Sequence, residues 1–78
     1  MIGIGYRHLR AFVEVARLSS VSQAADALAV SQPAVSKTLR ELEERLGTPL
    51  FERVGRRLRL TEAGRLFQRH AGLSLIEL

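Results

Sequence analysis

Residues 20–46 contain two helical segments, with only Ala29 and Val30 between the end of the first and the cap residue of the second, and this spacing limits the fold more than any other feature. Ser20 and Gln23 have the spacing of a capping box, in which a serine oxygen accepts a free amide of the first helical turn, and Ser22 is an alternative cap. A short helix is therefore expected to run to about Leu28. Because the next helix begins almost at once, the two are joined by a tight turn.

The second of these helices has clear start and stop signals. Ser31 is a favoured N-cap residue, and Pro33 falls in the first turn, where a backbone amide has no intrahelical acceptor to lose. Gly47 is a suitable C-terminal stop. The helix is therefore predicted over about residues 32–46. Its apolar stripe, at spacings of four, three and four, consists of Val35, Leu39, Leu42 and Leu46.

The charge of this predicted helix is polarised along its axis. Residues 31–40 contain Lys37 and Arg40 but no carboxylate, whereas three glutamates follow within residues 41–44. A surface that docks against phosphates excludes acids from its contact zone, so roughly the first two to three turns are expected to dock. The glutamates are interpreted as the water-facing, solubilising part of the helix.

Three further elements are expected around this pair of helices. Helical apolar spacing predicts a first helix over about residues 6–18. Residues 50–53 and 57–60 are strand candidates on either side of a turn at residues 54–56, and they should form a small hairpin that leans on the helices. Thr61 is a candidate N-cap for a fourth helix.

Two short helices joined by a tight turn, with the second helix basic at its start, form a helix-turn-helix, whose second helix reads the DNA major groove. The side chains expected to contact base edges are Gln32, Pro33, Ser36 and Lys37. The arginine-rich hairpin adds a wing that follows the phosphate backbone or enters the minor groove. The residues assigned to the backbone or the minor groove are Ser20, Ser22, Ser31, Thr38, Arg40, Arg53, Arg56 and Arg57.

Composition favours a polyanionic partner, because the 78 residues carry a net charge of +4. There is no cysteine, and His8 and His70 are far apart and expected at the surface or the edge of the core. No metal, cofactor or catalytic centre is therefore expected, and the chain is predicted not to be an enzyme. No segment has the character of a signal peptide or a membrane span, so a cytoplasmic protein that contacts no membrane is expected.

Two alternatives to DNA binding stay open on the residues alone. One is a winged-helix module that grips an acidic protein partner, and the other is a peptide that lies on an anionic membrane. DNA binding is preferred because the capped short helix, the tight turn, the basic helix and the arginine hairpin occur together.

The apolar residues after Thr61 spread around more of a helix than one small core covers. Self-association is the preferred explanation, and the chain is expected to be one piece of a longer protein. The residues assigned to dimerisation are Leu66, Phe67, Leu73, Leu75 and Ile76.

Five segments in order, AADAL, VSQPAVSK, LRELEERLG, LFER and LTEAG, give the chain a strong resemblance to the N-terminal winged helix-turn-helix of LysR-type bacterial transcriptional regulators. The resemblance implies a mainly α fold, with a three-helix core and a two-stranded wing in residues 1–60. Residues 61–78 would then be the start of a long linker helix that pairs two subunits. The separate C-terminal domain, which holds a small inducer in this family, is not among the 78 residues.

The resemblance also implies the partner. It indicates sequence-specific binding to double-stranded promoter or operator DNA by a homodimer, or by a tetramer in the full-length protein. Lys37 departs from the family pattern, because many relatives have arginine there. The segments FVEVAR and SQPAVSKTLRELE are most similar to regulators of aromatic-acid breakdown and sugar-uptake genes.

Overall fold

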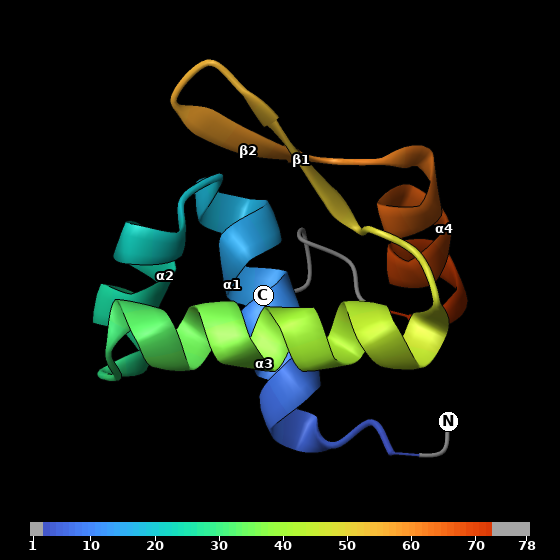
Figure 1. Ribbon diagram of the computed structural model, residues 1–78, viewed down its shortest axis with the longest axis horizontal. Helices are drawn as coiled ribbons and strands as arrows, with labels where there is room; N and C mark the ends of the chain where they lie inside the picture. The colour runs from blue at the N-terminus through green and yellow to red at the C-terminus, as the bar shows by residue number, and fades with distance from the viewer. Residues whose placement is uncertain (1–2, 73–78) are drawn as a thin grey trace.

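The computed structural model describes residues 3–72, which form four helices and one two-stranded sheet (Figure 1). The mainly helical winged helix-turn-helix predicted from the sequence is confirmed. None of the helices in this described range is long and apolar enough to cross a membrane. The elements in chain order are α1 (Tyr6–Leu18), α2 (Val21–Leu28), α3 (Gln32–Leu46), β1 (Phe51–Val54), β2 (Arg57–Leu60) and α4 (Glu62–His70).

Three of the helices begin at the hydroxyl caps that the sequence predicts. The side-chain oxygens of Ser20, Ser31 and Thr61 each accept the backbone N–H three residues later, at 3.0–3.2 Å. Ser20, not the alternative Ser22, is the cap of α2. Because each bond satisfies an amide that the helix itself leaves free, the starts of α2, α3 and α4 are determined locally.

Phe12 lies at the centre of the hydrophobic core and is fully buried. Its ring centroid is 5.0 Å from that of Phe67, edge to face, and 5.4 Å from that of Phe51. These aromatic pairs join α1 to α4 and to the hairpin. Leu42 of α3 and Leu50, just before β1, are also buried in this cluster.

The fourth helix differs from the prediction in two ways. Phe67 is a predicted dimerisation residue, and this is wrong, because its side chain is buried against Phe12 in the core of its own chain. The described helix also ends at His70, and Gly72 has a φ of +71°, the left-handed conformation with which helices often end. A long linker helix is therefore not seen within residues 3–72. Three other predicted dimerisation residues lie outside the described range: Leu73, Leu75 and Ile76.

The hairpin is antiparallel, and its register pairs Phe51 with Leu60 and Val54 with Arg57. The first strand begins one residue later than predicted. The reason is that Leu50 is buried in the core and donates its N–H to a carboxylate of α3 and not to the other strand.

Backbone and hydroxyl hydrogen bonds hold the hairpin against the rest of the domain. The N–H of Leu58 donates to the carbonyl of Ser19, just past the end of α1, at 3.0 Å. At the base of the hairpin, the N–H of Thr61 donates to Leu50 at 2.9 Å, and its hydroxyl donates to the carbonyl of Pro49 at 2.8 Å. The base and β2 are therefore fixed, while the turn projects away from the helices (Figure 1).

Gly64 lets α4 approach the chain very closely. A Cβ at this position would overlap the carbonyl oxygen of Leu50 and lie 2.9 Å from the side chain of Leu60. Because backbone atoms cannot yield as a flexible side chain can, only glycine fits this contact. The glycine of the LTEAG segment is thus required for packing α4 onto the base of the hairpin.

Candidate nucleic-acid interface

α3 runs along the outside of the molecule and buries a single stripe (Figure 1). Val35, Leu39 and Leu42 of this stripe face the core. The polar and basic side chains of its first half lie off the stripe. Those that are exposed are Gln32, Pro33, Lys37 and Arg40, and Ser36 is half-buried. All four side chains predicted to read bases are therefore at least partly accessible to a ligand.

Two backbone bonds form the turn between α2 and α3. The N–H of Ala29 donates to Asp26 at 3.2 Å, and the N–H of Val30 donates to Ala25 at 3.0 Å. Ala29 takes the left-handed conformation, with a φ of +58°, which is uncommon for a residue with a Cβ. Because of this tight turn, only Ala29 and Val30 separate the end of α2 from Ser31, the cap of α3.

The hairpin carries three arginines that have no acidic partner among residues 3–72. These are Arg53, Arg56 and Arg57, and all are exposed. Arg59 differs, because its Nε lies 2.9 Å from a carboxylate oxygen of Glu52 on the opposite strand. The unpaired positive charge is thus concentrated in the outer part of the hairpin.

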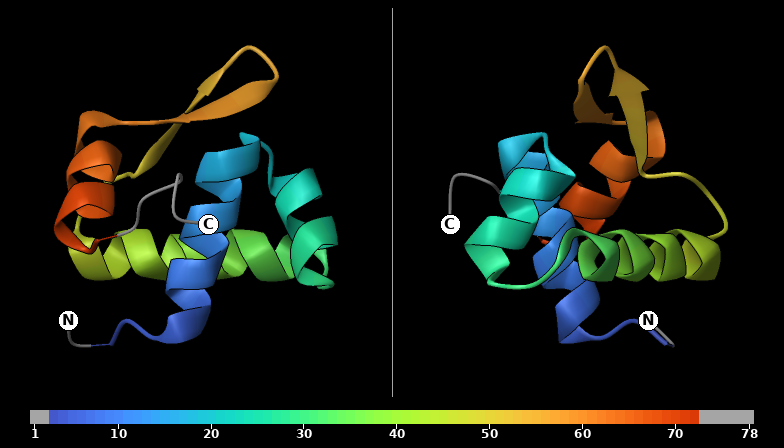
Figure 2. Two further views of the ribbon diagram at one scale, coloured as in Figure 1. Left: turned by 180° about the vertical axis from the view of Figure 1, so that it is seen from behind. Right: turned by 60° about the vertical axis from the view of Figure 1, so that its left-hand side comes forward.

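The two basic elements that the sequence predicts lie toward the same side of the molecule but do not touch there. In Figure 1 the hairpin turn and the N-terminal end of α3 are both on the left, the turn at the top and the helix end lower, with α2 at a height between them, and Figure 2 shows the same arrangement from behind. α4 lies on the opposite side. One elongated polyanion can therefore contact both elements at once.

Four hydroxyl side chains are predicted to contact phosphates. Ser20 and Ser31 already accept an amide N–H as helix caps, but a hydroxyl that accepts one bond can still donate its own proton. Ser22 is exposed and Thr38 is half-buried. The three serines lie at the N-terminal ends of α2 and α3, where free helix amides also favour anions.

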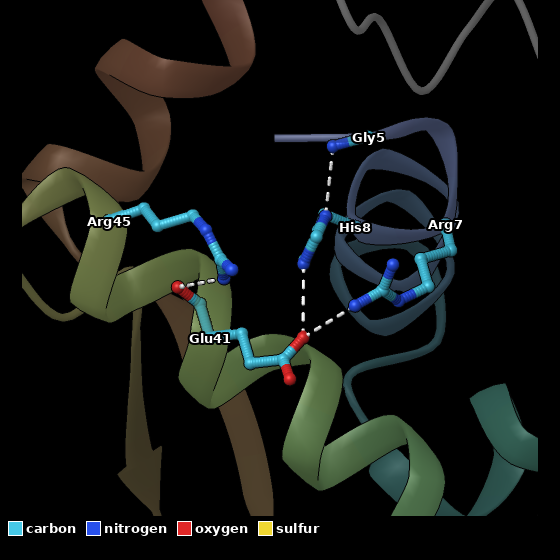
Figure 3. Close-up of polar contacts among 5 residues, drawn as sticks. All are labelled: Gly5, Arg7, His8, Glu41 and Arg45. Carbon is cyan, nitrogen blue, oxygen red and sulfur yellow. Dashed lines mark hydrogen bonds and ion pairs between the residues drawn. The ribbon is translucent and has the colours of Figure 1, made fainter. Parts of the chain in front are cut away.

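Glu41 joins α3 to the start of α1, as Figure 3 shows. Its Oε1 lies 2.8 Å from Nη2 of Arg7 and 3.2 Å from Nε2 of His8. These hydrogen bonds, the one from His8 first, lower the pKa of the Glu41 carboxyl below its ordinary value. Arg45 adds a bond from its guanidinium to the backbone carbonyl of Glu41 at 3.3 Å. An ionised carboxylate therefore fastens the two helices together.

His8 is buried more deeply than the sequence analysis predicts, with 2% of its surface exposed. The N–H of Gly5 donates to its Nδ1 at 2.9 Å, which assigns the ring proton to Nε2 and makes Nε2 the donor to Glu41. Both ring nitrogens are thus used in holding the start of α1. Within the described residues, no three His, Cys, Asp or Glu side chains gather as metal ligands would.

Glu43 connects α3 to the hairpin. Its Oε2 accepts the N–H of Leu50 at 2.7 Å and that of Phe51 at 3.4 Å. The prediction that the glutamates serve only solubility is therefore wrong for Glu41 and Glu43. Glu44 is exposed, as that prediction requires. A sequence offers no signal for these bonds, because their partners come from elements that only the fold brings near.

A tight turn between two helices, an exposed basic second helix and an arginine hairpin that packs on the helical core define a winged helix-turn-helix domain. A sequence model described as the bacterial regulatory helix-turn-helix protein of the lysR family matches residues 6–65. The chain belongs to this family.

Transcriptional regulators of similar sequence agree with this assignment. The chain is 56% identical over 75 residues to the HTH-type transcriptional regulator PcaQ of Agrobacterium fabrum, an alignment that covers 96% of this chain and 24% of that protein. It is 47% identical over 78 residues to the RuBisCO operon transcriptional regulator of Allochromatium vinosum, an alignment that covers 96% of this chain and 26% of that protein. The chain therefore spans about a quarter of the length of these relatives.

Solved structures share the fold. A complex of BenM_DBD with catB site 1 DNA superimposes with a TM-score of 0.81 at 41% identity, covering 87% of this chain and 76% of that one. A complex of CbnR_DBD with DNA superimposes with a TM-score of 0.82 at 38% identity, covering 88% of this chain and 79% of that one. A LysR-family regulator from Eggerthella lenta superimposes with a TM-score of 0.83 at 33% identity, covering 88% of this chain and 99% of that one. The domain therefore has the fold of LysR-type DNA-binding domains.

Proposed function

We propose that this domain binds double-stranded DNA in a sequence-specific way, as part of a bacterial transcriptional regulator. One observation carries the proposal: the acid-free first half of α3 and the unpaired arginines of the hairpin are exposed on elements that lie on one side of the molecule. A major groove about 12 Å wide accepts one α-helix. The DNA complexes of BenM_DBD and CbnR_DBD, which have the same fold, support the proposal.

In this proposal the first turns of α3 lie in the major groove. Gln32 pairs with adenine, Lys37 donates to guanine acceptors, and Pro33 contacts a thymine methyl. The hairpin arginines follow the backbone or enter a narrow minor groove, where the negative potential is strongest. Because regulators of this kind act on the chromosome, the domain works in the cytoplasm, and its role is regulatory and not catalytic.

Substitutions in α3 and the hairpin separate base reading from backbone contact. Gln32→Ala should weaken binding to a preferred duplex by about 1–3 kcal/mol and binding to random duplex very little. Arg57→Ala should weaken binding to all DNA sequences by a similar factor. It should also reduce the salt dependence of the binding constant by about the amount that one phosphate contact contributes. Fluorescence anisotropy at several salt concentrations, on a duplex selected from a random pool, measures both.

The control is Arg65→Ala, which removes an exposed arginine from α4, on the far side of the molecule and before the segment proposed to pair two copies. If Gln32→Ala lost the same affinity for the preferred and the random duplex, Gln32 would not be a base-reading residue. Tight binding to an acidic protein with no sequence preference for DNA would instead favour a protein-interaction module.

We also propose that two copies pair through the segment that begins at Leu66, so that two α3 helices meet successive major grooves about 34 Å apart. Leu66 is 40% exposed on α4, and more apolar residues follow it in the sequence. Light scattering at high concentration should detect a dimer, and Leu66→Gln should weaken it more than Val54→Gln does. A monomer at high concentration would contradict this pairing.

A further inference from the structure

A groove of about 530 Å³ lies beside the proposed DNA-reading face, between the start of α1, the end of α2 and one flank of α3. Its apolar lining includes Tyr6, Leu28, Val30 and Ala34. Tyr6 is 73% exposed and Val30 is 49% exposed. A concave apolar surface therefore faces solvent, which is characteristic of a binding site.

The rim of this groove is positively charged. Arg10 lies over the ring of Tyr6, with its guanidinium carbon 5.7 Å from the centroid and Nη1 3.4 Å from the phenol oxygen. Lys37 lies on the α3 wall. Glu41 is the acidic residue of the lining, and two side chains of α1 already bind its carboxylate. Neither Arg10 nor Lys37 has an acidic partner among residues 3–72.

We propose that this groove binds a small molecule that has one carboxylate and an apolar body. The carboxylate pairs with Arg10 and Lys37, while the apolar body covers Val30 and Leu28 and packs on the ring of Tyr6. The volume lies within the range of about 300–1,000 Å³ that small-ligand sites occupy. A polyphosphate fits less well, because it would leave the apolar wall uncovered.

Occupation of the groove has a consequence that rests on the proposed function. Lys37 belongs both to the groove and to the surface of α3 that is proposed to contact DNA. A carboxylate bound to Lys37 neutralises one of the cations in the first half of α3. The ligand and DNA therefore oppose each other, and by linkage each weakens the binding of the other by the same factor.

Titration of the ¹⁵N-labelled 78-residue chain with octanoate, followed by amide NMR shifts, tests the site. Saturable shifts are expected at Leu28, Ala34, Lys37 and Thr38. Acetate and octylamine should produce no saturable shift there, because one lacks the apolar body and the other has the wrong charge. Octan-1-ol should bind about tenfold more weakly than octanoate, since it lacks the charge-assisted pair.

Matched variants separate the groove from general surface effects. Val30→Ser should raise the octanoate Kd about fourfold, the effect of roughly one buried methylene group, and Val54→Ser should leave it unchanged. Val54 is a fair control, because it is also 49% exposed but lies in the hairpin. Arg10→Gln should weaken binding, and Arg69→Gln should not. Absence of saturable shifts, equal binding of octylamine, or equal effects within either pair would overturn the proposal.

Coupling to DNA is measured separately by anisotropy of a labelled duplex. Saturating octanoate should raise the duplex Kd of the unmodified chain more than that of Val30→Ser, and an unchanged Kd refutes the coupling. If octanoate binds but no duplex does, the proposed function fails and the groove assignment stands. If a duplex binds but octanoate does not, the groove assignment fails alone.

Discussion

Replacement of Glu43 by alanine tests how the hairpin is held to α3. In the structure its Oε2 accepts one short bond, 2.7 Å from the N–H of Leu50, and one marginal bond, 3.4 Å from Phe51. A hydrogen bond to a charged group contributes roughly 1.5–3 kcal/mol net. The short bond should contribute its full value and the marginal bond very little, so we expect Glu43→Ala to lower the free energy of unfolding by about 2 kcal/mol. For a domain of this size, that lowers Tm by roughly 8–16 °C.

Thermal unfolding followed by circular dichroism measures this loss, with Glu44→Ala as the matched control. That variant removes the same charge from the same helix, but Glu44 is exposed and accepts no hydrogen bond within residues 3–72. It should change stability by less than about 0.5 kcal/mol. Hydrogen exchange at the Leu50 amide should accelerate only in Glu43→Ala. Equal Tm changes in the two variants, or unchanged exchange at Leu50, would refute the assigned role.

Two further predictions concern the contacts at Gly64 and Glu41. Gly64→Ala should destabilise the fold by about 1–3 kcal/mol in chemical denaturation, because the added methyl overlaps the backbone of Leu50; wild-type stability would show that α4 can shift freely. The lowered pKa of Glu41 means that its stabilisation is fully present above the unfolded pKa of about 4.3 and is lost as pH falls through the lower folded value. Glu41→Gln should therefore flatten the decline of stability between about pH 5 and pH 3, and an unchanged decline would contradict the assignment.

Local signals were sufficient to predict most of the fold. Ser31, Pro33 and Gly47 determine the limits of α3, because capping and backbone geometry depend on neighbours in the sequence. The burial of Phe67 could not be predicted in this way. An apolar residue on a helix fits equally well against its own core or a second subunit, and the choice depends on where Phe12 lies in three dimensions.

The proposed interface could be predicted as far as it depends on the positions of basic and acidic residues along one helix and one hairpin. The contacts that hold these elements in place could not be predicted. His8 and Glu41 are 33 residues apart, and the pairing of Glu43 with Leu50 requires the chain to return alongside α3. The conformations of Ser19 and Ala29, both left-handed without being glycine, also have no sequence signal here. Each residue is the C-cap of its helix, and its N–H bonds back to a carbonyl of the last turn.

The placement of the acids explains how α3 can be both anchored and exposed. Glu41 and Glu43 are two residues apart, so they project about 200° from each other around the helix. One binds α1 and the other binds the start of the hairpin, which secures α3 on opposite flanks. If these carboxylates lay in the first half of α3, they would repel phosphates. In the second half they stabilise the domain, and residues 31–40 are left with Lys37 and Arg40 as their only charges.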